Sequence, residues 1–177
     1  MPPQPPTNSI TLRTHRASDI STIVSRHGAL YAAEYGWDTT SCAAFAARIL
    51  DDFTDKYDPA LERCWIAEDA ESKFAGCIVL VKDRDDAAED DNTAKLRLLL
   101  VEPSARGMGV GKKLVAQCVA FARDAGYRRM VLWTQSVLVS ARGIYKAAGF
   151  RMLRTEEHES FGAKVVGEFW ELVLDEA

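Results

Sequence analysis

The sequence predicts an α/β domain with a mixed, mostly antiparallel central sheet of about seven strands, flanked by about four helices. Segments with strand and helix periodicity follow one another in the order β-α-α-β-β-β-α-β-α-β-β. This order combines hairpins, whose strands are antiparallel, with two β-α-β crossovers, whose strands are parallel. No internal repeat or linker divides the 177 residues. We therefore expect a single domain over residues 10–177, preceded by a proline-rich disordered tail at residues 1–9.

The first half of the chain is expected to hold a short strand, two helices and then three strands. Alternation of apolar and polar residues predicts the first strand at 10–14. Ser18 or Asp19 can cap the first helix, whose apolar residues recur at helical spacing as far as Gly36. The second helix begins near 39–41. Apolar runs then predict three strands, at 64–67, 75–81 and 96–101.

The second half alternates helices and strands and ends in a hairpin. A helix is expected at 109–125, where Gly126 ends it. The last helix carries an apolar stripe formed by Val137, Ala141, Ile144 and Ala148. Strands are expected at 130–134, 150–155 and 165–174.

Charge and composition exclude several classes of function. The net charge is −4, so no basic surface for nucleic acid or for an anionic membrane is expected. No apolar run approaches the roughly 18 residues of a membrane-spanning helix, and the N-terminus lacks the features of a signal peptide, which predicts a cytoplasmic protein. The four cysteines form no C-x-x-C pair and the three histidines are scattered, which predicts buried free thiols and no metal site.

A glycine-rich turn, Arg106-Gly-Met-Gly-Val-Gly-Lys112, lies between an expected strand and an expected helix. Its alternate glycines lack Cβ atoms, so the backbone can approach a ligand closely or take positive φ angles. The helix behind the turn directs unpaired N–H groups and the positive end of its dipole at the same place. These features predict an anion site whose usual ligand is phosphate. The alternative is a turn that binds nothing.

Two familiar phosphate loops do not fit this turn. The dinucleotide motif G-x-G-x-x-G needs a glycine where Lys112 stands. A P-loop needs a glycine at Arg106 and a serine or threonine at Lys113.

The segment from Leu98 to Gly111 instead resembles the signature of the GNAT superfamily of N-acyltransferases, [QR]-x-x-G-x-[GA], with Arg106, Gly109 and Gly111 at its defining positions. Downstream, Ser140-Ala-Arg-Gly-Ile-Tyr-Lys-Ala-Ala-Gly-Phe150 resembles a second motif of that superfamily. Segments 27–36 and 132–134 are similar, more narrowly, to the acetyltransferase half of MarR-type regulator–acetyltransferase fusions. Only nine residues precede the domain, so we expect neither the winged-helix half nor DNA binding.

The resemblance implies that acetyl-CoA is the cosubstrate. It implies that the fourth and fifth strands splay apart and that the cofactor is bound by residues on the exposed strand edge, in the turn and at the start of the downstream motif. These are Leu99, Leu100, Val101, Arg106, Gly107, Met108, Gly109, Val110, Gly111, Lys112 and Ser140. It also makes Tyr145 the general acid that protonates the leaving thiolate.

The sequence itself supports the role of Tyr145. It follows Ile144 and so lies about 100° around the helix, at the margin of the apolar stripe. A phenol and a thiol have ordinary pKa values of about 10 and 8.5, close enough for proton transfer to a departing thiolate. A tyrosine that only packs is the alternative.

The general base is not evident. Many GNAT members carry a glutamate early in the fourth strand, where this chain has Lys95 and no carboxylate between residues 94 and 101. Glu34 and Glu102 are our candidate catalytic bases, and the further possibilities are Glu156, Glu157 and His158. Water is another.

Three further features are open to interpretation. His27, on the apolar face of the first helix, is expected to be a satisfied core histidine and not a functional one. The aromatic residues Tyr31, Tyr35 and Trp37 either line an acceptor pocket or belong to the core. The acidic stretch 83–91 is a solvated turn or attracts a cationic amine.

The sequence thus predicts an N-acetyltransferase that moves the acetyl group of acetyl-CoA to a primary amine of a small molecule or peptide by direct attack. The alternative is a non-catalytic acyl-CoA-binding sensor of the same fold. Either a monomer or a homodimer is consistent with it. Because no base is evident, an α-amine, whose pKa is about 7.7–8.0, is favoured over a lysine-like amine, whose pKa is about 10.4.

Overall fold

The structure is a computed structural model that describes residues 9–85 and 92–174. Its elements are β1 (Thr11–Thr14), α1 (Asp19–Tyr35), α2 (Thr39–Asp55), β2 (Arg63–Glu68), β3 (Phe74–Lys82), β4 (Thr93–Val101), the 3-10 turn η1 (Pro103–Ala105), α3 (Val110–Asp124), β5 (Arg129–Gln135), α4 (Val139–Ala147), β6 (Arg151–Ser160) and β7 (Ala163–Val173). The strands form one seven-stranded sheet in the order β1-β2-β3-β4-β5-β7-β6. Only β4 and β5 are parallel, so the predicted mixed, mostly antiparallel fold class is confirmed.

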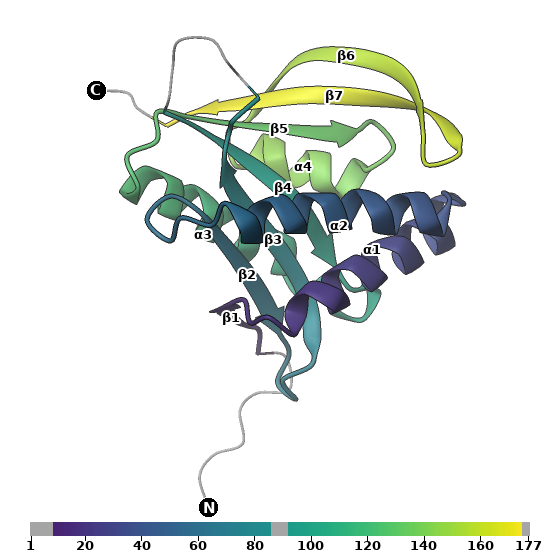
Figure 1. The fold of residues 1–177 in the computed structure, drawn as a ribbon, viewed down its shortest axis with the longest axis horizontal. Coiled ribbons are helices and arrows are strands. Elements are labelled where there is room, and N and C mark those ends of the chain that lie inside the picture. The colour runs from purple at the N-terminus through teal and green to yellow at the C-terminus, as the bar shows by residue number, and fades with distance from the viewer. Residues whose placement is uncertain (1–8, 86–91, 175–177) are drawn as a thin grey trace, which may run out of the picture.

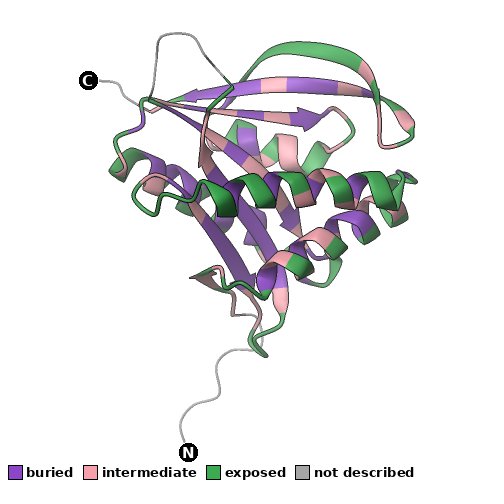
Figure 2. Ribbon diagram, in the orientation of Figure 1, coloured by how far each residue is buried: buried purple, intermediate pink, exposed green. Residues whose placement is uncertain are grey.

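Helices α1 and α2 cover one face of the sheet, and α3 and α4 cover the other (Figure 1). Two core clusters follow from these layers. The face under α3 and α4 buries Leu80, Leu96, Leu114, Met130 and Trp170. The face under α1 and α2 buries Ile23, Leu50, Phe53, Ile66 and Val79. The central strands are therefore buried on both sides, whereas the outer strand β6 is exposed along most of its length (Figure 2).

The sheet opens at its middle, because β4 and β5 pair only from Thr93 and Arg129 to Leu96 and Leu132. Beyond that point β7 continues to pair with β5, and β3 continues to pair with β4. The opening begins beside a β-bulge in β4, where Leu98 has a φ of 54° and the register with β3 shifts. A bulge bends its strand and increases its local twist. The two strands therefore diverge, as the family resemblance implied.

The structure corrects several expected boundaries. The closing strands extend further towards Gly162, so the hairpin is longer than the sequence pattern indicated. Helix α4 begins at Val139, and Val137 lies outside it and is 47% exposed. The reason is the turn after β5, where Ser136 N–H donates to Val166 and Leu138 N–H donates to Gln135, so the chain becomes helical only after that turn.

Other expectations have mixed outcomes. All four cysteines are buried free thiols, as expected. Most of the tail and residues 86–91 of the acidic stretch lie outside the described residues. Within the described part of the chain, no helix has both the length and the apolar character needed to cross a membrane.

Candidate active site

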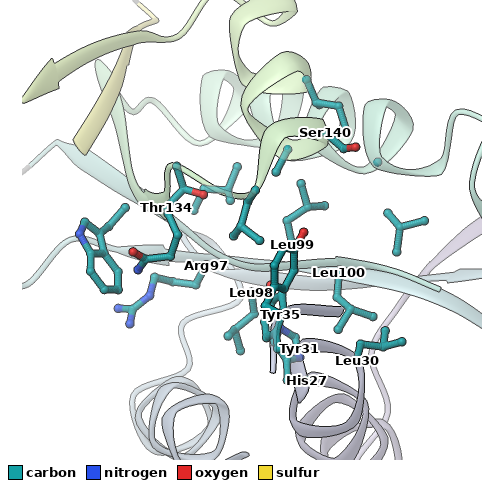
Figure 3. Close-up of a pocket in the computed structure, with 18 of the residues that line it drawn as sticks. His27, Leu30, Tyr31, Tyr35, Arg97, Leu98, Leu99, Leu100, Thr134 and Ser140 are labelled. Atoms are coloured by element: carbon teal, nitrogen blue, oxygen red, sulfur yellow. The ribbon is translucent and has the colours of Figure 1, made fainter. Parts of the chain in front are cut away.

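A cavity of about 950 Å³ occupies the opening between β4 and β5. It reaches both faces of the sheet: Ser140 of α4 lies on one side of β4, and Tyr31 and Tyr35 of α1 lie on the other (Figure 3). We call the part lined by the glycine-rich turn, the edge of β4 and α4 the turn half. We call the part lined by α1, α2, the end of β5 and the β6–β7 hairpin the aromatic half.

The three glycines of the turn have two different tasks. Gly107 and Gly109 have φ angles of 81° and 72°, where a residue with a Cβ atom is strained. Gly111 has an ordinary φ, but a Cβ there would lie 2.7 Å from Ile144 Cδ1 of α4. The first two glycines therefore shape the turn, and the third lets α3 and α4 pack closely.

The turn presents backbone donors to the cavity. Gly109 is the N-cap of α3 and makes no side-chain cap, and the first helical bond runs from Lys113 N–H to Gly109. The N–H groups of Val110, Gly111 and Lys112 consequently have no acceptor within the helix. Every predicted cofactor residue lines the cavity except Met108, which packs against the core and whose N–H donates to Ala105.

Arg106 forms an ion pair with Glu34, and both side chains line the cavity. This pair connects the turn to α1 across the mouth of the cavity. It also means that Glu34, one of the two candidate bases, has its carboxylate next to a guanidinium.

Tyr145 is 4% exposed and is the one buried residue of α4. Its ring packs near Phe150 and Trp170, with centroids 5.8 and 6.4 Å away. Burial, and then the neighbouring Tyr31 phenol, raise the pKa of Tyr145. Among the described residues its hydroxyl has no hydrogen-bond partner, although the residue lines the cavity. Tyr145 is therefore a protonated phenol available to whatever occupies the opening.

The sequence also matches the model of a known protein family, and the match includes most of the residues that line this cavity. Residues 29–150, more than half of the chain, match the model of the acetyltransferase (GNAT) family. The chain belongs to the GNAT family of acetyltransferases. The expected cosubstrate, acetyl-CoA, is the one that this family binds.

Curated GNAT relatives match only in part. N-acetyltransferase 8B of Homo sapiens is 35% identical over 103 residues, which are 58% of this chain and 44% of that protein. N-acetylaspartate synthetase of Danio rerio is 38% identical over 71 residues, 40% of this chain and 25% of that protein. The matched region thus spans less than half the length of either relative.

Solved structures share the GNAT fold at low sequence identity. YncA from Salmonella typhimurium, solved with its cofactor acetyl-CoA, has a TM-score of 0.72 and 20% identity, over 95% of each chain. Ribosomal-protein-alanine N-acetyltransferase from Brucella melitensis has a TM-score of 0.73 and 16% identity, over 93% of this chain and 99% of that one. The narrower resemblance to MarR-type fusions is not tested by these matches and stays a prediction.

The candidate bases of this GNAT chain are not gathered in one place. Glu102 is 8% exposed, accepts two hydrogen bonds from Arg26 at 2.5 and 2.9 Å, and is not among the residues that line the cavity. Glu34, Glu156 and His158 do line it. Lys95, where many GNAT members have glutamate, lines the cavity and pairs with Asp85 at 2.9 Å.

The aromatic half contains both expected and unexpected residues. Tyr31, Tyr35 and Trp37 line the cavity and also pack on one another, with ring centroids 5.2 to 6.1 Å apart. Trp37 and Tyr31 belong to a core cluster, whereas Tyr35 is exposed, and their role as an acceptor pocket stays a prediction. His27 is 2% exposed and its Nδ1 lies 2.9 Å from the Ile23 carbonyl oxygen, so it is buried as expected. Its Nε2, however, has no hydrogen-bond partner among the described residues, and the residue lines the cavity, so it is not the satisfied core histidine that was expected. Burial lowers the pKa of His27 to about 4.

Sequence reasoning missed the cavity residues of β4, β5 and β7, namely Arg97, Trp133, Gln135 and Phe169. A usable signal existed. Two parallel strands that diverge expose alternate side chains of both, so every second residue beyond the last paired position was a candidate.

Proposed function

We propose that this chain is an enzyme that transfers the acetyl group of acetyl-CoA to a primary amine of a small molecule or peptide, with Tyr145 as general acid. The observation that carries the proposal is the cavity between β4 and β5, which joins a turn rich in backbone donors to a buried phenol without a partner among the described residues. A site that only bound acyl-CoA would not need the phenol.

The turn half suits acetyl-CoA as a substrate. The free N–H groups at the start of α3, with Arg106 and Lys112, would bind the pyrophosphate. The edge of β4 from Leu99 to Val101 is unpaired on the side of β5, so the amide groups of the pantetheine arm can add to it as a further strand does. Ser140 lines the same half and would contact the arm.

The chemistry at the opening needs a nucleophile, an acid and a place for one proton. The neutral amine attacks the thioester carbon, a C–N bond forms and the C–S bond breaks. Tyr145 donates its proton to the departing sulfur, and the nitrogen loses a proton to water or to a base. That water or base then passes the proton to the tyrosinate, which restores the phenol. Burial raises the pKa of Tyr145, which keeps the phenol protonated before sulfur leaves but makes it a weaker acid towards the thiolate than an exposed phenol is.

The surroundings favour an acceptor that needs little help to lose its proton. A lysine-like amine is neutral about one time in a few thousand at pH 7, and an α-amine about one time in ten. Glu34 is paired with Arg106, and Glu102 is paired with Arg26 outside the cavity lining. We therefore propose an α-amine, with Glu34, Glu156, His158 or water as the proton acceptor.

The direct test is thiol release from acetyl-CoA with a panel of amines, together with calorimetry of acetyl-CoA binding. Binding with amine-dependent thiol release supports the enzyme. Binding without release on any amine would favour a non-catalytic acyl-CoA sensor, and no binding would overturn both.

A further inference from the structure

Arg97 holds an unusual position in the aromatic half of the cavity. It is the first residue of β4 beyond the pairing with β5 and directly precedes the bulge at Leu98. Its register partner, Val79, belongs to the core under α1 and α2, so Arg97 faces the same side. The view of the cavity shows its side chain extending from β4 on the same side as Tyr31 and His27 (Figure 3).

Arg97 forms no ion pair within the described residues, although Asp52, Asp83 and Asp85 lie near enough to act on its charge. Three other arginines, Arg26, Arg84 and Arg142, each bind a buried glutamate at 2.5 to 2.8 Å. Arg97 has no such ion pair with any residue in 9–85 or 92–174, and its guanidinium carbon lies 5.9 Å from the centre of the Phe45 ring. Burial lowers the pKa of Arg97. A partly desolvated guanidinium inside a cavity is a ready partner for an anion.

Gln135 supplies a second polar side chain on the face of the sheet that Arg97 occupies. Because Leu96 pairs with Leu132 and faces the opposite core, Trp133 and Gln135 share the face of Arg97. Gln135 is 4% exposed, lines the cavity, and its amide oxygen is buried without a hydrogen-bond partner in the described part of the chain. A buried acceptor of this kind is costly unless a ligand donates to it.

Apolar rings surround these two polar groups. The Trp133 ring lies 6.3 Å from Phe45 and 6.4 Å from Phe169, and all three line the cavity. The aromatic half therefore offers a hydrogen-bond donor fork, a hydrogen-bond acceptor and an apolar wall.

We propose that the acceptor is a free α-amino acid with an apolar side chain, whose carboxylate is bound by Arg97 and whose amine donates a hydrogen bond to Gln135. This inference rests on the proposed acetyl transfer and names its substrate class. An α-amino acid carries both an anion, for which the Arg97 guanidinium is a partner, and a hydrogen-bond donor, for which the Gln135 amide oxygen is an acceptor. The amide of Gln135 is neutral, so it orients the amine without holding it as an ammonium ion, and the lone pair stays available for attack.

The test uses matched acceptors: an amino acid, its carboxamide and its decarboxylated amine, in three sets built on phenylalanine, leucine and alanine. Thiol release from acetyl-CoA is measured for each acceptor, and each rate is divided by the concentration of that acceptor's neutral amine form before the rates are compared. We expect the acid of the preferred set to exceed its amide at least tenfold in kcat/KM. Arg97→Gln should raise the KM for that acid at least tenfold, because a charged hydrogen bond to its carboxylate is lost. The KM for the carboxamide and the KM for acetyl-CoA should each stay within about twofold of the wild-type values.

Two further variants separate charge from position. Arg97→Lys keeps the charge but not the planar fork, so its KM for the acid should lie between those of the wild type and Arg97→Gln. Arg48→Gln makes the same change of charge at an exposed site on α2 that does not line the cavity, and it should behave as wild type. Thermal melting of each variant confirms that it is folded.

The outcomes distinguish the two levels of the proposal. If amines are acetylated but acids have no advantage, or the advantage survives Arg97→Gln, the acceptor assignment is wrong and acetyl transfer stands. If no member of any set releases thiol, the assignment is also wrong, and acetyl-CoA calorimetry then decides whether the cofactor site stands.

Discussion

The two halves of the cavity recognise their ligands by different means. The turn half is built from a few contiguous segments, and most of what it presents is backbone: free N–H groups at the start of α3 and the open edge of β4. The aromatic half is built from side chains contributed by α1, α2, β4, β5, β6 and β7. A backbone site depends on conformation and tolerates many side chains, whereas a side-chain site depends on identity at scattered positions. Changes in the turn half should therefore affect acetyl-CoA, and changes in the aromatic half should affect the acceptor.

The largest effect is expected at Tyr145 of α4, in the turn half. Tyr145→Phe removes one hydroxyl and keeps the ring, so the fold and acetyl-CoA affinity should survive. Turnover should fall by on the order of tenfold to a thousandfold, because the leaving thiolate loses its acid. Steady-state kinetics with an accepted amine measures this, and wild-type turnover in the variant would reduce Tyr145 to a packing residue.

The buried imidazole of His27, in the aromatic half, should make stability depend on pH. Its pKa is lowered to about 4 in the folded state because burial disfavours the imidazolium ion. The unfolded chain, where the pKa is about 6.5, binds more protons at lower pH. The contribution of His27 to the free energy of unfolding is therefore complete above about pH 6.5. It is lost as the pH falls towards 4, and the loss is at most about 3 kcal/mol.

Urea unfolding of wild type and His27→Asn between pH 7 and 4 measures this effect. The slope of unfolding free energy against pH should be smaller in the variant, since asparagine cannot titrate. Equal slopes would show that His27 does not control the acid limb of stability.

In the turn half, Gly109→Asp should weaken acetyl-CoA binding at least tenfold, about 1.4 kcal/mol, because it puts a negative charge and bulk at the proposed phosphate site. Gly109→Asn tests the bulk alone, since asparagine tolerates the positive φ angle. Gly143→Asp adds the same charge at an exposed position of α4 with no atom within 4 Å of its Cβ and should leave affinity unchanged. Unchanged calorimetric affinity in Gly109→Asp would contradict the site.

In the aromatic half, Gly167→Ala should act on the acceptor alone. A Cβ at Gly167 would lie 2.5 Å from Trp133 Nε1, so the indole must move. We expect the KM for the acceptor to change about threefold to tenfold, which corresponds to the loss of part of a ring contact, with acetyl-CoA affinity unchanged. An equal effect on both ligands would mean that the two halves are coupled and not separate.

The last test compares classes of acceptor amine and changes no residue of either half. Amino acids or peptides blocked at either the α- or the ε-amine are supplied at equal concentration near pH 7, and the rate of acetylation of the free amine is measured. We expect the α-amine to be acetylated faster. If the ε-amine reacts as fast, a dedicated base is present, and Glu34 becomes the first residue to replace.

The differences between the two halves explain which features of the site could be predicted from the sequence alone. The turn was predictable because Gly107 and Gly109 are needed for their positive φ angles, and the spacing of such residues is visible in the chain. Tyr145 was predicted at the margin of the apolar stripe of its helix. It is instead the one buried residue of α4, and the stripe residues Ala141 and Ile144 are only half-buried. The partners of Glu34 and Glu102 were not predictable, since Arg106 is 72 residues from Glu34 and Arg26 is 76 residues from Glu102. Arg97 and Gln135 line one cavity because the sheet opens after Leu96 and Leu132, and the sequence does not show where that opening begins.

The exposed outer strand β6 has a consequence for how molecules of this protein meet each other. Its outer edge carries backbone groups without a neighbouring strand in the described sheet, and such an edge is a template for another chain. Along it stand Arg151, Arg154, Glu156, Glu157 and Glu159. A second strand docking there would strip water from these charges and place like charges against each other in many registers, so the strand that shelters the cavity also resists aggregation.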